Sequence, residues 1–420
     1  MITLIESRNY RCLRYVCRPL NPFQVLVGPN ASGKSTFLDV VSFLGDLVSD
    51  GPETAVRNRT EDIHDLFWKR EGTQFDLAVE VRIPEEKQQL IRKKECNTIR
   101  YEIEIGLDES TDEIGILWEH VLLKKSESVE QITLPTLFPI VIPYPETIRT
   151  PTHNKSSTTI ANKKPGGNDN FYSETYRIGG KGWTPSFKLG PRKSTLANLP
   201  DDESEFPVSI WLKSLLIEGV QKFILNSTEI RKMSPPGQTK TFKSDGSNLP
   251  WVVAELKEKD YERYISWIKH IRTALSDLRS IQVMEREDIR HKYLVVEYEN
   301  GLKVPSWMVS DGTLRLLALT LPAYLPDFNG IYLIEEPENG IHPRAVETMF
   351  ESLSSAYQAQ ILMATHSPVV LSIAKAVDVL CFAKTEQGAT DIIKGAEHPK
   401  LRDWQGETNL GTLFASGVLG

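Results

Sequence analysis

The residues of this chain best suited to chemistry lie in the segment GPNASGKS at positions 28–35, which matches the pattern G-x-x-x-x-G-K-[ST]. Glycines allow backbone N–H groups to turn onto phosphate oxygens, and the start of a following helix adds a favourable dipole. The Lys34 ammonium supplies charge to the β- and γ-phosphates, and the Ser35 hydroxyl can ligate Mg²⁺. We therefore expect an ATP site lined by Asn30, Ala31, Ser32, Gly33, Lys34, Ser35 and Thr36.

Two adjacent carboxylates, Glu335 and Glu336, end the short apolar run at 331–334. Neighbouring like charges repel each other and resist burial, so a divalent cation and a water molecule between them best explain the pair. We expect Glu335 to hold Mg²⁺ through its water shell and Glu336 to act as the general base toward the attacking water.

A second apolar run, at 360–364, ends in Thr365-His366-Ser367. A histidine at the end of a strand close to such carboxylates can hydrogen-bond the γ-phosphate or the attacking water. The predicted catalytic residues are therefore Glu336, His366 and Lys34.

These side chains meet only if several strands end at one edge of a sheet. The apolar pattern predicts a strand at 23–28 and a helix at 34–48 on either side of the glycine-rich loop. Strands and helices then alternate in the last part of the chain, which indicates an α/β unit wound around a parallel sheet. The expected elements there are a helix at 314–325, a strand at 331–335, a helix at 344–357, a strand at 361–364, a helix at 369–376 and a strand at 378–383.

The remaining sequence divides the chain into four expected regions. Three alternating runs between 75 and 122 suggest an antiparallel sheet, and regular periodicity is lost after 123. The segment 249–275 has an amphipathic helical pattern that predicts two helices, and a hairpin is expected at 292–305. We expect an N-terminal ATPase lobe at 1–122, an irregular basic insertion at 123–204, a helical or lid region at 205–300, and a C-terminal ATPase lobe at 301–420.

Composition excludes some classes of protein. The 420 residues are 40% hydrophobic and 25% charged, as in ordinary soluble proteins, and no apolar run approaches the roughly 18 residues of a membrane span. The four cysteines lack metal-ligand spacing, and the first residues do not resemble a signal peptide. We expect a cytoplasmic protein with reduced thiols and no membrane partner.

Charge is unevenly distributed along the chain. The net charge is −7, yet the segment 151–193 carries eight basic and two acidic residues, a net charge of +6, together with five aromatic rings. Cations interleaved with stacking rings suit a nucleic-acid backbone and unpaired bases, whereas the same composition also describes a solvated flexible loop. Both interpretations stay open at this point.

Four motifs in order carry a family resemblance: GPNASGKS, VSDGTLRLLAL (309–319), LIEEPENGIHP (333–343) and ATHSP (364–368). This order resembles the ABC-type ATPase heads of the RecF, SMC and Rad50 group. It looks closest to compact AAA-like ATPases related to the overcoming-lysogenization-defect nucleases, which are often found in bacterial anti-phage systems. The resemblance covers roughly 1–120 and 205–420. It implies a P-loop ATPase head with a mixed or parallel central sheet, an antiparallel β subdomain, a helical subdomain and an irregular insertion.

By this resemblance, Ser310, Asp311, Gly312 and Thr313 form a signature that contacts ATP bound to a second protomer. The start of a helix offers a hydroxyl, backbone N–H groups and a positive dipole end to a γ-phosphate. Ser310 and Gly312 are therefore expected ATP contacts, and the protein is expected to form an ATP-dependent homodimer or higher oligomer.

The sequence also departs from the family pattern. The family usually has Asp where Glu335 stands, so the Mg²⁺ role of this residue has less support than the catalytic role of Glu336. Asn339 and His342 occupy the stretch that faces the dimer partner in relatives. The glutamine loop is not located, because Gln74 and Gln221 both fit.

Two functional hypotheses follow. In the first, the protein is a switch or scaffold ATPase that controls a separately encoded effector in anti-phage defence. Nuclease relatives carry a metal-dependent Toprim domain after the ATPase, but only about 50 residues follow His366 here and they lack a suitable acidic cluster, so no intrinsic nuclease is expected. In the second, the protein is a DNA-binding repair or recombination ATPase of the RecF kind that uses 151–193.

Overall fold

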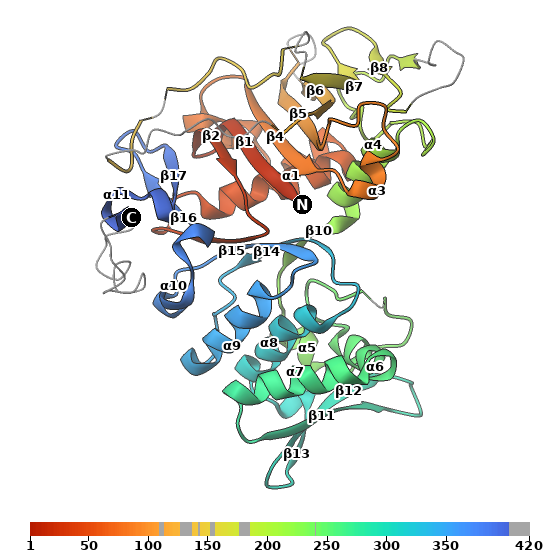
Figure 1. Cartoon of the computed structure of the whole chain (residues 1–420), viewed down its shortest axis with the longest axis vertical. Coiled ribbons are helices and arrows are strands. Elements are labelled where there is room, and N and C mark those ends of the chain that lie inside the picture. Colours follow the sequence, from red (N-terminus) through yellow and green to blue (C-terminus); the bar gives the residue numbers. More distant parts are fainter. Residues whose placement is uncertain are drawn as a thin grey trace.

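A parallel sheet lies between two lobes in the computed structural model (Figure 1). The upper lobe in Figure 1 contains a large antiparallel sheet and helix α1, and the lower lobe contains helices α5 to α9 with a small sheet. The structure describes residues 1–108, 113–126, 137–141, 143–151, 156–175, 185–239 and 241–402. Within these ranges, no helix is both long and apolar enough to cross a membrane.

The parallel sheet has the strand order β10-β14-β15-β3-β16-β17, in which only β17 runs antiparallel to its neighbour. The strands predicted near 23, 331, 361 and 378 are confirmed, whereas β10 and β17 were not anticipated. Strand bounds are β3 Phe23–Val27, β10 Val220–Phe223, β14 Gly330–Glu335, β15 Ala359–Ala364, β16 Val379–Lys384 and β17 Thr390–Lys394.

Both faces of this sheet are buried, which explains its nearly continuous apolar strands. Successive side chains alternate between two cores: Leu333 and Leu362 pack with the upper lobe, and Tyr332 and Met363 pack with the lower lobe. The sheet therefore joins the lobes and holds its strand ends in fixed relative positions.

Helices follow these strands as the sequence predicted, with shifted ends. The helix predicted at 314–325 begins earlier, because Ser310 caps it, and it tightens into a 3₁₀ turn after Thr320, because Pro322 cannot continue the hydrogen-bond ladder. The helices of this part are α1 Lys34–Asp50, α2 Pro52–Arg57, α8 Asp311–Thr320, α9 Pro343–Ser354, α10 Pro368–Ile373 and α11 Pro399–Arg402.

The antiparallel sheet has the order β2-β1-β4-β5-β6-β7-β8-β9 and so extends into the segment predicted to be irregular. The insertion at 123–204 is thus irregular only in part. Its strands are short and polar, and what holds them is the burial of Ile160, Ala161 and Phe171 in the upper core, which no local pattern reveals. The strands are β1 Ile2–Tyr10, β2 Leu13–Pro19, β4 Gln74–Arg82, β5 Thr98–Leu107, β6 Ile114–Lys124, β7 Ser157–Lys163, β8 Asp169–Phe171 and β9 Ser186–Phe187.

The lower lobe contains the two predicted helices of 249–275, separated at Asp260, whose carboxylate caps the second helix. The predicted hairpin at 292–305 is present as β12 and β13, and β11 adds a strand that the sequence pattern did not indicate. The bounds are α5 Ser227–Arg231, α6 Leu249–Lys259, α7 Tyr261–Ala274, β11 Leu278–Glu285, β12 Lys292–Tyr298 and β13 Lys303–Pro305. Two short helices, α3 Glu85–Gln88 and α4 Pro207–Ser214, precede this lobe.

Candidate nucleotide-binding site

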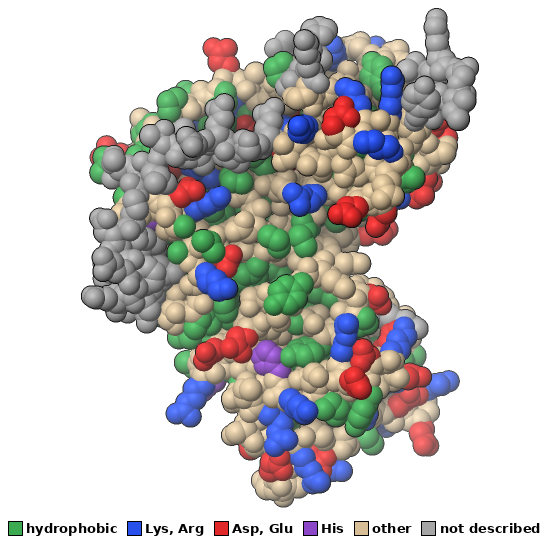
Figure 2. Space-filling model, in the orientation of Figure 1, with side chains coloured by type: hydrophobic (Ala, Val, Ile, Leu, Met, Phe, Trp, Pro, Cys, Tyr) green, Lys and Arg blue, Asp and Glu red, His purple; other side chains and the backbone are tan. Residues whose placement is uncertain are grey.

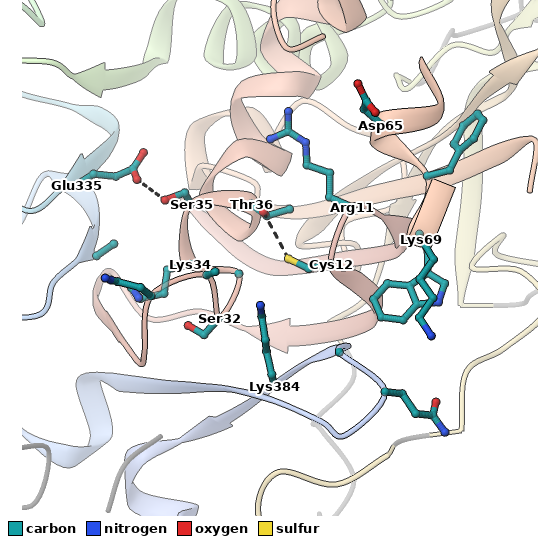
Figure 3. Close-up of a pocket in the computed structure, with 18 of the residues that line it drawn as sticks. Arg11, Cys12, Ser32, Lys34, Ser35, Thr36, Asp65, Lys69, Glu335 and Lys384 are labelled. Carbon is teal, nitrogen blue, oxygen red and sulfur yellow. Dashed lines mark hydrogen bonds between the residues drawn. The ribbon is translucent and has the colours of Figure 1, made fainter. Parts of the chain in front are cut away.

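The strand order brings the predicted loop and acidic residues to one edge of the sheet. β15 lies between β3, which leads into the glycine-rich loop, and β14, which ends in Glu335. Around this edge is a cavity of about 720 Å³ (Figure 3). Among its lining residues are the seven that were predicted to line the ATP site and three residues from the other strand ends: Asn30, Ala31, Ser32, Gly33, Lys34, Ser35, Thr36, Glu335, Glu336 and His366.

The glycines of the loop are required by close packing as well as by backbone conformation. Gly33 precedes α1 with φ 103°, and a Cβ there would lie 2.3 Å from Thr390 Oγ1. A Cβ on Gly28 would lie 2.2 Å from the carbonyl oxygen of Phe382. Since the Thr390 hydroxyl donates to the Ser32 carbonyl at 2.9 Å, strand β17 and the loop hold each other in place.

Lys34 is folded back onto its own loop. Its Nζ donates to the carbonyl oxygens of Gly28 at 2.8 Å and Pro29 at 2.9 Å. Burial lowers the pKa of Lys34 to about 8, against the opposing effect of the Glu336 and Glu335 charges. Among the described residues, this buried ammonium donates its hydrogen bonds to neutral carbonyls, which phosphate oxygens can replace.

Ser32 tests whether a phosphate group fits this loop. Its hydroxyl is buried and has no hydrogen-bond partner among the described residues. Buried polar groups are normally paired, so this hydroxyl lacks an acceptor that a phosphate oxygen in the cavity would supply. The loop therefore fits a bound polyphosphate.

Ser35 and Glu335, the two residues predicted to hold Mg²⁺, contact each other. The Ser35 hydroxyl donates to one carboxylate oxygen of Glu335, and Lys222 Nζ lies 2.7 Å from the other (Figure 3 draws the Ser35 bond). Burial raises the pKa of Glu335, but hydrogen bonds from Lys222 and Ser35 outweigh it and hold that pKa below its ordinary value. Hydroxyl and carboxylate oxygens are the ligands that Mg²⁺ prefers, and it commonly takes one or two from protein and the rest from phosphates and water.

Glu336 has a left-handed backbone, with φ 47°, which is uncommon for a residue with a side chain. Its N–H donates to the Ala364 carbonyl at 2.8 Å, so the turn after β14 is fastened to the end of β15. Asn339 donates a side-chain hydrogen bond to its carboxylate, and His366 Nε2 lies 3.7 Å from Glu336 Oε1. The structure thus places the predicted base and histidine next to each other.

The imidazole of His366 is held in its neutral form. Burial and the nearby Lys34 charge lower the pKa of His366, and the Glu336 and Glu338 carboxylates oppose this shift only in part. A neutral imidazole at pH 7 can either donate or accept a hydrogen bond, according to its tautomer.

The signature residues lie elsewhere in the chain. Ser310 caps α8 by accepting from the Thr313 N–H at 3.2 Å, and with Gly312 it lines a separate cavity of about 400 Å³ that also includes Gly340 and His342. Neither Ser310 nor Gly312 lines the P-loop cavity. A single chain therefore does not bring its own signature onto its own P-loop.

Several residues that line the P-loop cavity belong to no motif that the sequence displays. The 3₁₀ turn formed by Trp68, Lys69 and Arg70 lines the cavity, and so do Arg11 and Cys12 from the turn between β1 and β2. Lys69 and Arg70 have φ of 53° and 60°, and nothing in the local sequence signals that conformation.

The two glutamines considered for a glutamine loop also have a position. Gln74 starts β4 and Gln221 lies in β10, and neither lines the P-loop cavity. Lys222, the neighbour of Gln221, makes the contact with Glu335 instead.

Comparison with known proteins identifies the family. A family model described as "AAA domain, putative AbiEii toxin, Type IV TA system" matches residues 23–372. The chain belongs to this AAA family. No curated protein matches the sequence of this AAA-family member.

Solved structures resemble this AAA-family chain over nearly its whole length. The SMC head bound to the C-winged helix domain of ScpA is 12% identical, with a TM-score of 0.51, and covers 93% of this chain and 96% of that one. A Pyrococcus furiosus Smc head with an extended coiled coil is 12% identical over 93% and 95%, with a TM-score of 0.49. The Thermotoga maritima SMC head is 10% identical over 94% and 98%, with a TM-score of 0.40. The AAA-family chain therefore has the ABC-type ATPase-head fold, as its motif order predicted.

Proposed function

We propose that this AAA-family protein binds and hydrolyses ATP with Mg²⁺ and that the bound nucleotide joins two copies of the chain. The observation that carries the proposal is the meeting of three strand ends around one cavity, which assembles the P-loop, the carboxylate pair and His366. Each group in this arrangement has a distinct task in phosphoryl transfer to water.

The loop residues hold the phosphates. We assign the phosphate contacts to backbone N–H groups of the glycine-rich turn, to the Ser32 hydroxyl, and to the Lys34 ammonium once it leaves the Gly28 and Pro29 carbonyls. Ser35 and Glu335 would hold Mg²⁺, which when bound offsets the negative charge of the β- and γ-phosphates.

Glu336 and His366 act on the attacking water. The Glu336 carboxylate accepts a proton from this water, and the proton then passes to the released phosphate. Neutral His366, adjacent to Glu336, orients the water or the γ-phosphate by a hydrogen bond.

The signature supports association of two copies. Ser310 and Gly312 stand at the first turn of a ten-residue helix, in a cavity separate from the P-loop. A second copy can present them to the γ-phosphate bound by the first, since the helix start offers N–H groups and a hydroxyl. Hydrolysis removes the group that both copies contact and so weakens their association.

The variant Glu336→Gln tests this proposal. It removes the general base, which typically contributes about 10²- to 10⁴-fold to rate, while it leaves the phosphate contacts in place. With Mg²⁺-ATP the variant should form a stable dimer in light scattering and show almost no phosphate release. The exposed Glu258→Gln in α6 is the matched control and should behave like the wild type. An E336Q protein that stays monomeric with saturating ATP would contradict the nucleotide-bridged dimer.

We further propose that this cycle, in the cytoplasm, controls a separately encoded effector in anti-phage defence. The resemblance to anti-phage ATPases and a family description that mentions a toxin of a toxin–antitoxin system support this role. A related fold, the SMC head, is recorded with a domain of a separate protein, ScpA. This role would be supported if the product of a neighbouring gene co-purified with the protein in the presence of ATP and failed to co-purify with Lys34→Ala. The absence of any co-purifying partner, with or without ATP, would contradict the role.

DNA binding through 151–193 has less support from the structure. Lys163 is buried and pairs with Asp169 at 2.5 Å, and Arg192 pairs with Glu113, so two of its cations are already neutralised. On the face drawn in Figure 2, basic and acidic side chains are interspersed. Lys155, Tyr176, Arg177, Lys181 and Trp183 of this segment lie outside the described residues. Salt-dependent DNA retention that is lost on deleting 176–184 would favour the RecF-like alternative over the effector switch.

A further inference from the structure

Lys222 is a cation placed directly at the proposed metal position. It lies on β10, the edge strand beside β14, where it pairs in register with Leu333, two residues before Glu335. Its Nζ contacts Oε1 of Glu335 at 2.7 Å, and Ser35 donates to Oε2. Both oxygens of the carboxylate are therefore engaged by groups of the chain itself.

The contact between Lys222 and Glu335 reduces the repulsion between the adjacent carboxylates of Glu335 and Glu336. Glu335 and Glu336 would repel each other in a half-buried site, and a positive charge on one of them reduces that repulsion. The Lys222 ammonium provides this charge from a strand more than 100 residues away in the sequence.

Lys222 and Mg²⁺ would use the same carboxylate. A second cation close to Nζ is repelled by it, and a carboxylate oxygen occupied by an ammonium is not available to the water shell of a metal. The side chain of Lys222 is 47% exposed, so it has solvent to move into when it leaves.

We propose that Lys222 is a resident cation of this site, which holds Glu335 while the metal is absent and is displaced from it when Mg²⁺ and nucleotide bind. This inference rests on the proposed ATPase function and adds a competing group to it. Lys222 is a positioning residue: it acts on the metal through Glu335.

The segment that follows Lys222 is fastened to the signature helix. After β10 the segment runs into α5, where Arg231 Nη2 lies 2.6 Å from the Asp311 carboxylate of the signature and its Nη1 donates to the Trp307 carbonyl at 3.1 Å. The carbonyl of Leu225 on the way accepts from Arg315 of α8 at 3.3 Å. The backbone of β10 is paired with β14, so the exchange moves only the Lys222 side chain and leaves this segment in place.

Metal titration tests the exchange directly. Wild type, Lys222→Met and Lys222→Gln, each loaded with stoichiometric adenylyl imidodiphosphate, are titrated with Mn²⁺, and free Mn²⁺ is measured by electron paramagnetic resonance. A partly exposed ion pair of this kind predicts roughly two- to fivefold tighter Mn²⁺ binding in both variants. Lys232→Met is the matched control, because Lys232 lies on the same segment and pairs with Glu229 at 2.6 Å, away from the site.

Hydrogen exchange gives a second readout. Exchange in 224–231 without Mn²⁺ should be the same in the wild type and in Lys222→Met, because β10 stays paired with β14, and equal exchange assigns any change in Mn²⁺ affinity to the Lys222 side chain. Unchanged or weaker Mn²⁺ affinity in both Lys222 variants, with the analogue still bound, would overturn the exchange and leave the ATPase proposal standing. A wild type that retains neither analogue nor Mn²⁺ would overturn the ATPase proposal, and the exchange with it. Melting curves of the three variants show whether each one folds. If Lys222→Met does not fold, the Mn²⁺ affinity of Lys222→Gln decides between these outcomes.

Discussion

Glu338 should matter to ATP hydrolysis although it lies outside the predicted catalytic residues. Its Oε1 accepts a hydrogen bond from the Thr365 hydroxyl at 2.6 Å and another from the His366 backbone N–H at 3.2 Å. Its Oε2 is buried and has no hydrogen-bond partner among the described residues. The carboxylate thus ties the loop after β14 to the loop that carries His366. We predict that Glu338→Ala slows turnover because His366 loses its fixed position.

The magnitude follows from the kind of hydrogen bond that is lost. Bonds to a charged group contribute about 1.5–3 kcal/mol, and if one such contribution is lost in the transition state, turnover falls roughly 10- to 150-fold. Glu338→Gln keeps an acceptor of about half the strength, so it should lower turnover by roughly 3- to 12-fold. Thr365→Val removes one partner of the same carboxylate, and its effect should not add fully to that of Glu338→Ala.

Steady-state phosphate release across pH distinguishes positioning from general damage. The Glu338 charge raises the pKa of His366, whereas burial and the Lys34 charge lower this pKa by more. If neutral His366 is the working form, activity is lost as pH falls through this pKa. Removing the Glu338 charge lowers the pKa, so the acid limb should move to lower pH in Glu338→Gln, with little change in KM for ATP. Wild-type turnover and an unmoved acid limb in Glu338→Ala, alongside an inactive His366→Ala, would refute this reasoning.

Two further predictions concern the P-loop lysine and the signature glycine. Lys34→Met should abolish nucleotide binding. The stability of this variant relative to the wild type should fall as pH rises from about 8 toward 10.5, because the buried wild-type ammonium loses its proton in that window while the unfolded chain keeps it. Thermal melts across pH check this prediction, and a stability difference that stays constant would contradict it. Gly312→Ala would place a Cβ 2.5 Å from the Gly340 carbonyl, so it should lower stability by about 1–3 kcal/mol and impair ATP-dependent dimerisation, as denaturation and light scattering would report. Gly167→Ala, whose Cβ would meet its nearest atom at 3.5 Å, should leave both unchanged.

Much of the site could be predicted because its functional residues lie in short contiguous motifs. The phosphate loop, Glu335-Glu336 and His366 each follow a recognisable apolar strand, and parallel strands in an α/β unit end at one edge. The strand register then places the predicted residues around one cavity.

The parts that could not be predicted depend on segments whose neighbours are distant in sequence. Lys222 was overlooked beside Gln221 because nothing local shows that β10 pairs with β14. The strands of the basic insertion were missed for a similar reason: they are short and polar, and the core that buries Ile160 and Phe171 comes from elsewhere in the chain.

The sequence by itself determined which functional groups the protein has and which backbone turns carry them, because a glycine-rich loop, a strand end and a helix cap are each set by a few adjacent residues. Only the tertiary structure decided which groups meet. The separation of Ser310 and Gly312 from the P-loop cavity, the Lys222–Glu335 contact and the Thr390 support of Gly33 all depend on how two cores close on opposite faces of one sheet. Burial of apolar surface over the whole chain determines that closure, and no short stretch of sequence encodes it.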